Sequence, residues 1–509
     1  MSDTLQLDDR LLLGPPRCHR LIMAIMVGGM LLTTGTVVAA AWAGVTQDVR
    51  LPRWFGPWPL RAPGALHGWV VLGLVLLAGL CALWTWLAAT VLRLPAVRDA
   101  WQGLRLRTVA VMAAVWALPF VLCGPVGSLD VQSYAAIGRL AAVGLDPYRM
   151  GPAALGDRFA VAVDPLWRAT PTPYGPLQVQ LLRGLSLLSG GHIGPAVLLI
   201  RAVSILALVA ALWFMLRAAE PADRLPALVI TALNPVVLVH LVSGAHLDVL
   251  VGLLAVLVVA CTRAGRPGLA MALAVVATAF KLPGAVLVAF VLLDVVRHTP
   301  GPLRSRALAP VVTSGLAVTT AVVAICPDPF GWVSALGVPG IVRNGAAPST
   351  WTAYAAGVLT GHLSGPELDL AFTLGRTAMG MLGVGAVVTL LWSATSGSKR
   401  QAFRGVGWAL IALAATGPAF YPWYLAWGLF AAAVGSGPRG RFAVVGLSVA
   451  ACVAAALSEG WIVFAVWLAL LVGTLWFWVW TGRDHLARRH AYEKSLPEAG
   501  SARVIPVWM

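Results

Sequence analysis

The chain has 509 residues, of which 59% are hydrophobic and 11% are charged, and its mean hydropathy is +0.84. Because a soluble domain has about 45–50% apolar and about 25% charged residues, this composition excludes a soluble globular protein and indicates a polytopic membrane protein. The formal net charge of +16 could suggest a nucleic-acid partner, but no basic stretch is joined to a soluble domain, so we expect none.

Apolar runs close to the ~20 residues that cross a bilayer as a helix recur along the whole chain. The runs are 21–43, 67–91, 108–123, 195–216, 225–241, 247–261, 268–280, 284–296, 307–325, 370–393, 405–416, 421–434, 442–457 and 461–480. The first is longer than the apolar region of a signal peptide, so we expect it to be a retained helix. Together they predict an all-α polytopic membrane protein with about fourteen transmembrane helices.

Basic residues gather in alternate loops between these runs, as they do on the cytoplasmic side of membrane proteins. The N-terminus, 1–20, and the basic tail, 482–509, belong to the same set, so an even number of crossings places both termini in the cytoplasm. This parity requires 268–296 to be two short helices, because "KLPG" (281–284) interrupts the run. Residues 21–481 then form one transmembrane domain with two outer loops, 124–194 and 327–349.

The first outer loop has prolines at spacings that predict ordered turns and short interfacial helices. Asp130 opens a stretch of helical character, 131–143, which is too short and too polar to span a membrane. Tyr134 lies four residues further on and shares one helical face with Asp130. The common role of such an aspartate is to cap its helix. The alternative is a catalytic carboxylate, and the two roles are compatible.

A second polar group interrupts the apolar sequence "NPVVLVHLVSGAHLDVLVG" (234–252) and places His240, His246 and Asp248 around a tight turn at the outer surface. Ionisable residues at membrane depth are unfavourable unless they face a cavity or a partner. A lone histidine in this setting is more commonly a packing residue than a catalyst. The spacing is not that of a zinc site, so we expect no metal centre.

Two cations are expected on the same outer side of the membrane. Lys281 is an intramembrane cation without a partner nearby in the sequence. Arg343 follows in "VRNG" of the second outer loop, where a solvated loop charge is an equal alternative to a ligand-binding role.

The sequence "GPAFYPWYLAW" (417–427) is an aromatic cluster between two predicted crossings. Aromatic belts at membrane interfaces are common, and we assign Trp427 to such a belt. For Tyr421, Trp423 and Tyr424 a stacking platform for sugar rings is an open alternative.

Together these segments resemble the GT-C membrane glycosyltransferases, and more closely the polyprenol-phosphomannose-dependent α-1,6-mannosyltransferases of bacterial lipomannan biosynthesis. The matching segments run in order from about residue 124 to residue 430. They are "DVQSY" (130–134), "GLDPYRMGPA" (144–153), "LWRATPTPYGPL" (166–177), "NPVVLVHLVSGAH" (234–246), "KLPG" (281–284), "VRN" (342–344) and "PWYLAW" (422–427). This chain has Leu247 and Asp248 after the second histidine, where the family tends to carry polar residues, and this variation leaves the acceptor open.

The resemblance implies a GT-C fold with a catalytic outer loop, and it assigns roles to individual residues. Asp130 would be the catalytic base, and Lys281 and Arg343 would bind the donor phosphate. The residues implied to position the substrate are Tyr134, His240, His246 and Asp248, and those implied to bind the acceptor are Trp167, Tyr174, Trp423 and Tyr424. No cofactor is implied, and a metal requirement stays open.

The implied activity is an inverting transfer of mannose from polyprenyl-phosphate mannose to a lipid-anchored mannoside acceptor. It would extend the mannan backbone of lipomannan at the outer face of the cytoplasmic membrane, among membrane lipids. One alternative is a GT-C transferase of another polyprenyl-phosphate sugar. The alternative of a different class is a transporter or flippase for a lipid-linked saccharide, which predicts paired repeats with broken helices in both halves.

Overall fold

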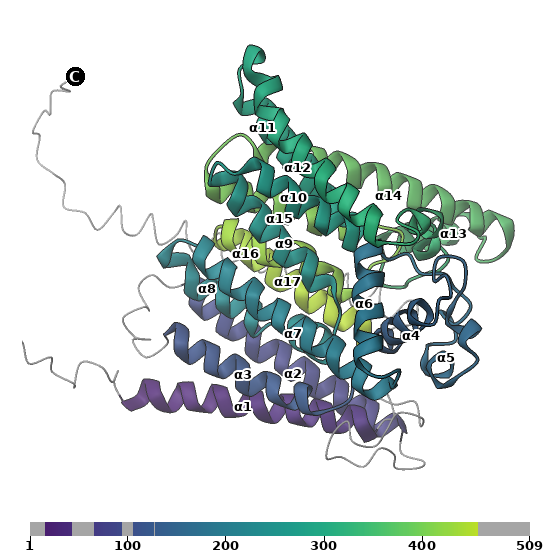
Figure 1. Cartoon of the computed structure of the whole chain (residues 1–509). Helices are drawn as coiled ribbons and strands as arrows, with labels where there is room; N and C mark the ends of the chain where they lie inside the picture. Colours follow the sequence, from purple (N-terminus) through teal and green to yellow (C-terminus); the bar gives the residue numbers. More distant parts are fainter. Residues whose placement is uncertain (1–15, 43–65, 94–104, 127, 457–509) are drawn as a thin grey trace, which may run out of the picture.

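The computed structural model describes residues 16–42, 66–93, 105–126 and 128–456, and all regular elements in these ranges are helices (Figure 1). The predicted all-α class is therefore confirmed for the described part of the chain. The predicted helix 461–480, the basic tail 482–509 and most of the N-terminal segment 1–20 lie outside it.

Three helices precede the first outer loop: α1 (Pro16–Trp42), α2 (Leu66–Arg93) and α3 (Leu106–Leu122). Buried indole N–H groups need an acceptor, and here they join helices. Trp116 Nε1 donates to the carbonyl of Met26 at 3.1 Å, which holds α3 against α1. Trp84 Nε1 donates to the carbonyl of Val229 at 2.9 Å, which holds α2 against α8 (Pro221–Ala232).

The segment predicted to be the first outer loop contains the short helices that the sequence predicts. They are α4 (Asp130–Ala142), the 3-10 turn η2 (Pro152–Leu155), α5 (Arg158–Ala162) and α6 (Pro176–Leu188). Helices α4 and α6 pack on α7 (Ile193–Ala218), and α5 and η2 pack on α4, around a core that includes Tyr134, Phe159 and Val197. This separate core gives the outer loop a defined position beside the membrane helices.

The predicted run 225–241 is not one continuous helix, because the chain bends by 68° between α8 and the π-helix η3 (Val237–Ser243). Asn234 precedes Pro235, and a residue before proline is disfavoured in helical conformation. The Asn234 side chain then satisfies the break, since its Oδ1 accepts from Val236 N at 2.9 Å and its Nδ2 donates to Ser448 Oγ at 2.9 Å. The predicted break at 281–284 is present, between α10 (Pro267–Phe280) and α11 (Ala285–His298).

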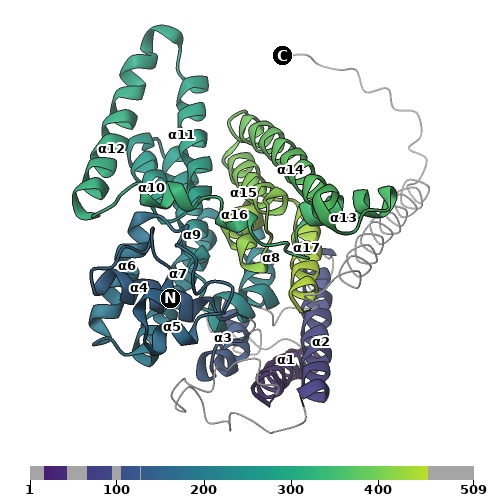
Figure 2. The same cartoon turned by 90° about the vertical axis from the view of Figure 1, so that its right-hand side faces the viewer.

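The remaining elements complete the bundle. They are α9 (Asp248–Arg263), η4 (Leu282–Gly284), η5 (Gly301–Leu303), α12 (Arg304–Ile325), η6 (Gly331–Ala335), η7 (Val338–Gly340), α13 (Pro348–Thr360), α14 (Gly365–Ala394), α15 (Lys399–Thr416), η8 (Pro422–Leu425), α16 (Ala426–Gly435) and α17 (Pro438–Ala456). Figure 2 places α10 to α12 on one side of the molecule and α13 and α14 on the other. Helices α9 and α16 pack against each other in the middle.

Within the described residues, five helices are long and apolar enough to cross a bilayer, which makes this chain a membrane protein. They are Arg20–Trp42, Val71–Leu92, Ile193–Ala218, Gly301–Ile325 and Gly365–Ala394. The bent pair formed by α8 and η3 would be a sixth span. The larger number of crossings stays a prediction.

Candidate functional site

A cavity of 480 Å³ lies where the first outer loop meets the break between α10 and α11 and the end of α15. Its polar lining consists of Asp130, Ser133, Thr170, Thr172, Tyr174, Lys281, Tyr421 and Tyr424. Its apolar lining includes Ile137, Trp167, Leu282, Val286, Leu336, Val338, Leu413 and Trp427. The cavity therefore joins an acid, a cation and aromatic rings, drawn from distant parts of the chain, to an aliphatic wall.

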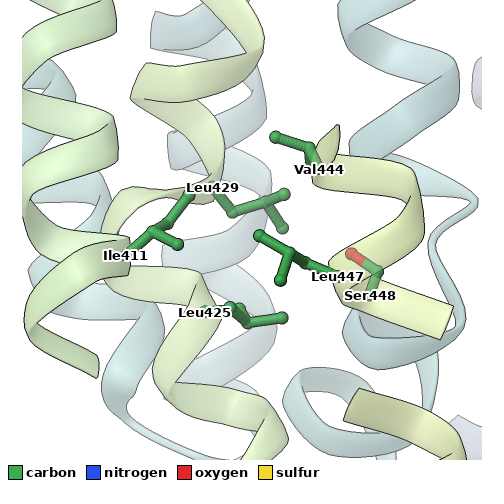
Figure 3. A pocket seen from close by; sticks show the side chains of 6 residues that line it. All are labelled: Ile411, Leu425, Leu429, Val444, Leu447 and Ser448. Carbon is green, nitrogen blue, oxygen red and sulfur yellow. The ribbon is translucent and has the colours of Figure 1, made fainter. Parts of the chain in front are cut away.

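A second space lies among apolar side chains of α15, η8, α16 and α17, and Figure 3 shows these side chains pointing toward one another. Its volume is 10 Å³, which is room for about one water molecule. It is lined by Ile411, Leu425, Leu429, Val444, Leu447 and Ser448. Its size and walls exclude it as a substrate site.

Asp130 is the first residue of α4, but it does not cap this helix. Leu129 occupies the cap position, and no side-chain oxygen accepts from the first turn. The Asp130 backbone N–H donates instead to Ser128 Oγ at 3.1 Å. The capping interpretation is therefore wrong, and the carboxylate is free to face the cavity. Burial raises the pKa of Asp130 to about 6, although the positive charge of Lys281 opposes this rise.

The segment that leads into Asp130 is held by a buried arginine of α7. Arg201 donates to the carbonyl of Cys123 at 2.7 Å and to that of Ser243 at 3.0 Å. Ser243 Oγ in turn accepts from the backbone N–H of Val126 at 2.9 Å. An intramembrane charge needs such polar partners, and these bonds tie the loop before Asp130 to the end of the π-helix.

His246 lies behind Asp130 rather than in the cavity. Its Nδ1 is 3.8 Å from Asp130 Oδ2 and 3.3 Å from the Tyr134 hydroxyl. Its ring stacks on Trp423, with centroids 3.7 Å apart and planes at 14°, and His240 completes the cluster at 6.0 Å from His246. Burial holds the pKa of His246 well below its usual range, so the ring is neutral.

The turn that presents His246 has unusual backbone geometry. Ala245 has a φ of 55°, a left-handed conformation that is uncommon for a residue with a side chain. Such strain tends to be kept at functional sites, where the surroundings hold it in place. Here Ser204 Oγ contacts the carbonyls of Leu241 at 2.8 Å and His246 at 3.3 Å, and so supports both sides of the turn.

Lys281 has a partner that its sequence neighbourhood does not reveal. Its Nζ lies 2.7 Å from Asp248 Oδ1, and the same oxygen accepts a hydrogen bond from Trp427 Nε1 at 2.6 Å. Three rings surround the ammonium, with centroids at 4.6 Å for Tyr424, 5.4 Å for Trp427 and 5.5 Å for Tyr174. Aromatic faces attract a cation, so Lys281 is fixed by one carboxylate and three rings.

This arrangement changes two sequence-based assignments. Asp248 was expected to contact the substrate, but it is 2% exposed and does not line the cavity. It contacts Lys281 instead. Trp427 is 5% exposed, lines the cavity and bonds to Asp248. Its assignment to an interfacial belt is therefore wrong. Its position inside an aromatic motif that matches the family was the signal that could have identified it.

The segment "PTPYGPL" (171–177) brings Tyr174 to Lys281 through one glycine. The Gly175 N–H donates to the carbonyl of Phe280 at 3.0 Å, directly before Lys281. A Cβ at Gly175 would lie 2.2 Å from the carbonyl oxygen of Ala279. Only glycine allows this approach, which joins the first outer loop to the end of α10.

The residues implied to bind an acceptor fall into two positions. Trp167, Tyr174 and Tyr424 line the cavity, whereas Trp423 lies behind it, between His246 and Tyr421. Tyr421 stacks on Trp423 with centroids 4.7 Å apart and itself lines the cavity. The aromatic wall is thus a stacked column whose outer member, Tyr421, faces the open space.

Arg343 is not brought to the cavity. Its side chain is 46% exposed, pairs with Asp369 and lies over the ring of Phe372 at 4.5 Å. The second outer loop reaches the site through other residues, since Leu336 and Val338 line the cavity. Within the described ranges, no three His, Cys, Asp or Glu side chains come together as metal ligands.

Comparisons with known proteins agree with the resemblance in the sequence. Residues 23–297 match the family model described as alpha-(1->6)-mannopyranosyltransferase, N-terminal domain, and residues 349–485 match that of the MptB C-terminal domain. The chain is 32% identical over 380 residues to an alpha-(1->6)-mannopyranosyltransferase of Mycobacterium tuberculosis. The matched region covers 62% of this chain and 63% of the length of that relative.

Two further relatives carry the same description. Alpha-(1->6)-mannopyranosyltransferase A of Mycobacterium tuberculosis is 29% identical over 75% of this chain and 76% of its own length. Alpha-(1->6)-mannopyranosyltransferase B of Corynebacterium glutamicum is 26% identical over 62% of this chain and 56% of its own length. No solved structure matches the chain.

Proposed function

Because the chain belongs to the alpha-(1->6)-mannopyranosyltransferase family, we propose that it is a membrane enzyme that transfers mannose from polyprenyl-phosphate mannose to the 6-hydroxyl of a mannoside acceptor. The observation that carries this proposal is the single cavity that contains both Asp130 and Lys281. A transferase of this kind needs a base for the attacking hydroxyl and a cation for the departing phosphate, and the two must face one substrate.

In the proposed reaction, Asp130 accepts the proton of the acceptor hydroxyl while that oxygen forms a bond to the anomeric carbon of the donor. The bond from this carbon to the phosphate oxygen breaks, and its electron pair leaves with the phosphate. Lys281 stabilises the charge that develops there. One displacement inverts the anomeric configuration, so no second, nucleophilic carboxylate is required.

The apolar part of the cavity supports a lipid-borne donor. Leu282 follows Lys281 directly, Val286 lies in the first turn of α11, and Leu413 faces the same space from α15. An aliphatic wall that continues from the phosphate-binding cation suits the first isoprene units of a polyprenyl chain. The aromatic wall of Tyr421, Tyr424 and Trp167 suits the sugar rings, which stack on aromatic faces.

The proposed topology has about fourteen transmembrane helices in a GT-C fold, with the catalytic loop 124–194 and the loop 327–349 outside. The segments 1–20 and 482–509 would be cytoplasmic, flanking the transmembrane domain 21–481. The contact of Arg263 with Asp294 at 2.8 Å supports this parity, because it joins the far ends of α9 and α11. The product would be a longer mannan on a lipid anchor at the outer face of the cytoplasmic membrane.

The test is transfer in membranes that contain the protein, with polyprenyl-phosphate mannose and a short α-1,6-linked mannoside. We expect a product with a new α-1,6 linkage, and Asp130→Asn should lower its rate at least about a hundredfold, as loss of a general base does. Asp146→Asn is the matched control, because its amide can still accept from Tyr148 N, as the carboxylate does at 2.9 Å. Normal turnover by Asp130→Asn would remove this residue from the base role. If transfer occurred only from another polyprenyl-phosphate sugar, that sugar would take the place of mannose in the proposed reaction.

A further inference from the structure

One face of α4 lines the cavity with residues that change from charged to polar to apolar. Asp130, Ser133 and Ile137 are three and four residues apart, so they follow one another along the same side of the helix. Ser133 lies about 4.5 Å further along the helix axis than Asp130, from a rise of roughly 1.5 Å per residue. A sugar with one hydroxyl at Asp130 therefore has its ring within reach of Ser133.

The Ser133 hydroxyl has no role within the described part of the fold. The residue is 7% exposed, and its Oγ has no hydrogen-bond partner among the described residues. A serine or threonine inside a helix commonly bonds to a carbonyl of the preceding turn, as Thr278 Oγ1 of α10 does with the carbonyl of Ala274 at 2.9 Å. Because a serine side chain turns about a single bond, this hydroxyl is available to a ligand in the cavity.

We propose that Ser133 binds a ring hydroxyl of the acceptor mannose, the same sugar whose 6-hydroxyl contacts Asp130. This assignment rests on the proposed function and names a specificity residue for it. The acceptor is favoured over the donor because the hydroxyl that Asp130 deprotonates belongs to the acceptor, and Ser133 is the next residue on that face. A hydroxyl held here makes the configuration of one ring carbon a condition for transfer.

The experiment compares the unaltered protein with Ser133→Ala on the parent mannoside and on its monodeoxy analogues, each lacking one ring hydroxyl. Loss of one neutral hydrogen bond should lower kcat/KM for the parent acceptor about fivefold to tenfold. The analogue that lacks the contacted hydroxyl should be used equally well by both proteins, and the KM for the donor should not change. The control is Ser186→Ala, because the Ser186 hydroxyl is also buried and unpaired among the described residues, but lies on α6 outside the cavity.

Three results would overturn the assignment. The first is that Ser133→Ala leaves kcat/KM for the parent acceptor unchanged. The second is that it lowers kcat/KM for every acceptor by the same factor, and the third is that it changes only the KM for the donor. Absence of transfer by the unaltered protein would overturn the proposed function and this assignment with it. Normal transfer without the selective loss overturns the assignment alone.

Discussion

The pKa of Asp130 should set the lower pH limit of transfer, and two neighbouring charges should move this limit in opposite directions. Burial raises this pKa to about 6, the charge of Lys281 lowers it, and the charge of Asp248 adds to the rise. A general base acts only when it is deprotonated, so the rate should increase as the pH rises through this value.

The size of the effect follows from that pKa. About nine tenths of Asp130 is ionised at pH 7 and about one tenth at pH 5, so kcat/KM should fall about tenfold between these two values. Lys281→Met removes the charge that lowers the pKa of Asp130. The rising part of the pH–rate profile, called the acid limb below, should therefore move to higher pH. Asp248→Asn removes the charge that raises this pKa, so the acid limb should move to lower pH, while the less constrained Lys281 lowers the maximal rate.

The assay is the initial rate of mannose transfer at low substrate concentration, measured from about pH 4.5 to pH 8 so that both sides of the limb are visible. A phosphodiester donor keeps one negative charge over this range, so the limb reports on the enzyme. Ser186→Ala serves as the control and should keep the profile of the unaltered protein. A limb far from pH 6, or one that Lys281→Met and Asp248→Asn move in the same direction, would refute the role of Asp130 or its coupling to this pair.

Three other substitutions test the surroundings of the cation. Lys281→Ala should raise the KM for the donor at least about tenfold, because the variant loses a charge-assisted hydrogen bond to the phosphate. Normal donor kinetics would exclude a contact between Lys281 and the phosphate. Trp427→Phe keeps a ring but removes the N–H that bonds to Asp248, so it should lower stability by about 2 kcal/mol and reduce kcat; an unchanged melting temperature would contradict that bond. Gly175→Ala places a methyl group 2.2 Å from a carbonyl of α10 and should raise the donor KM, whereas Gly184→Ala, with open space around it, should not; equal behaviour of the two would refute the close approach.

Local signals were sufficient for much of the fold. Long apolar runs predict helices because a membrane span must satisfy its own backbone, and Pro283 with Gly284 marks a break because neither residue continues a helix well. The break at Asn234 was missed because the apolar run continues across it. The hydrogen bond from Asn234 to Ser448 that stabilises the bend spans 214 residues, and no local pattern contains it.

The site was predictable as a set of residue types but not as an arrangement. Asp130 and Lys281 stand out in the sequence because charges are rare in apolar surroundings. The contacts of Lys281 with Asp248 and Trp427 could not be predicted, since these residues meet only after α9, α10 and α16 have packed. Arg343 shows the reverse case: its charge is equally conspicuous, yet it pairs with Asp369 outside the cavity.

The cavity draws its walls from both matched segments, and this division has a consequence for biosynthesis. Asp130, Tyr174 and Lys281 belong to residues 23–297, while Tyr421 and Trp427 belong to residues 349–485. During translation the acid and the cation leave the ribosome well before the rings that enclose them. A fragment that stops before α15 would keep Trp167 and Tyr174 but lack Tyr421, Tyr424 and Trp427, so one side of Lys281 would have no aromatic cover. On the proposed function, the cavity would therefore be complete only late in synthesis, after α15 and α16 have been made.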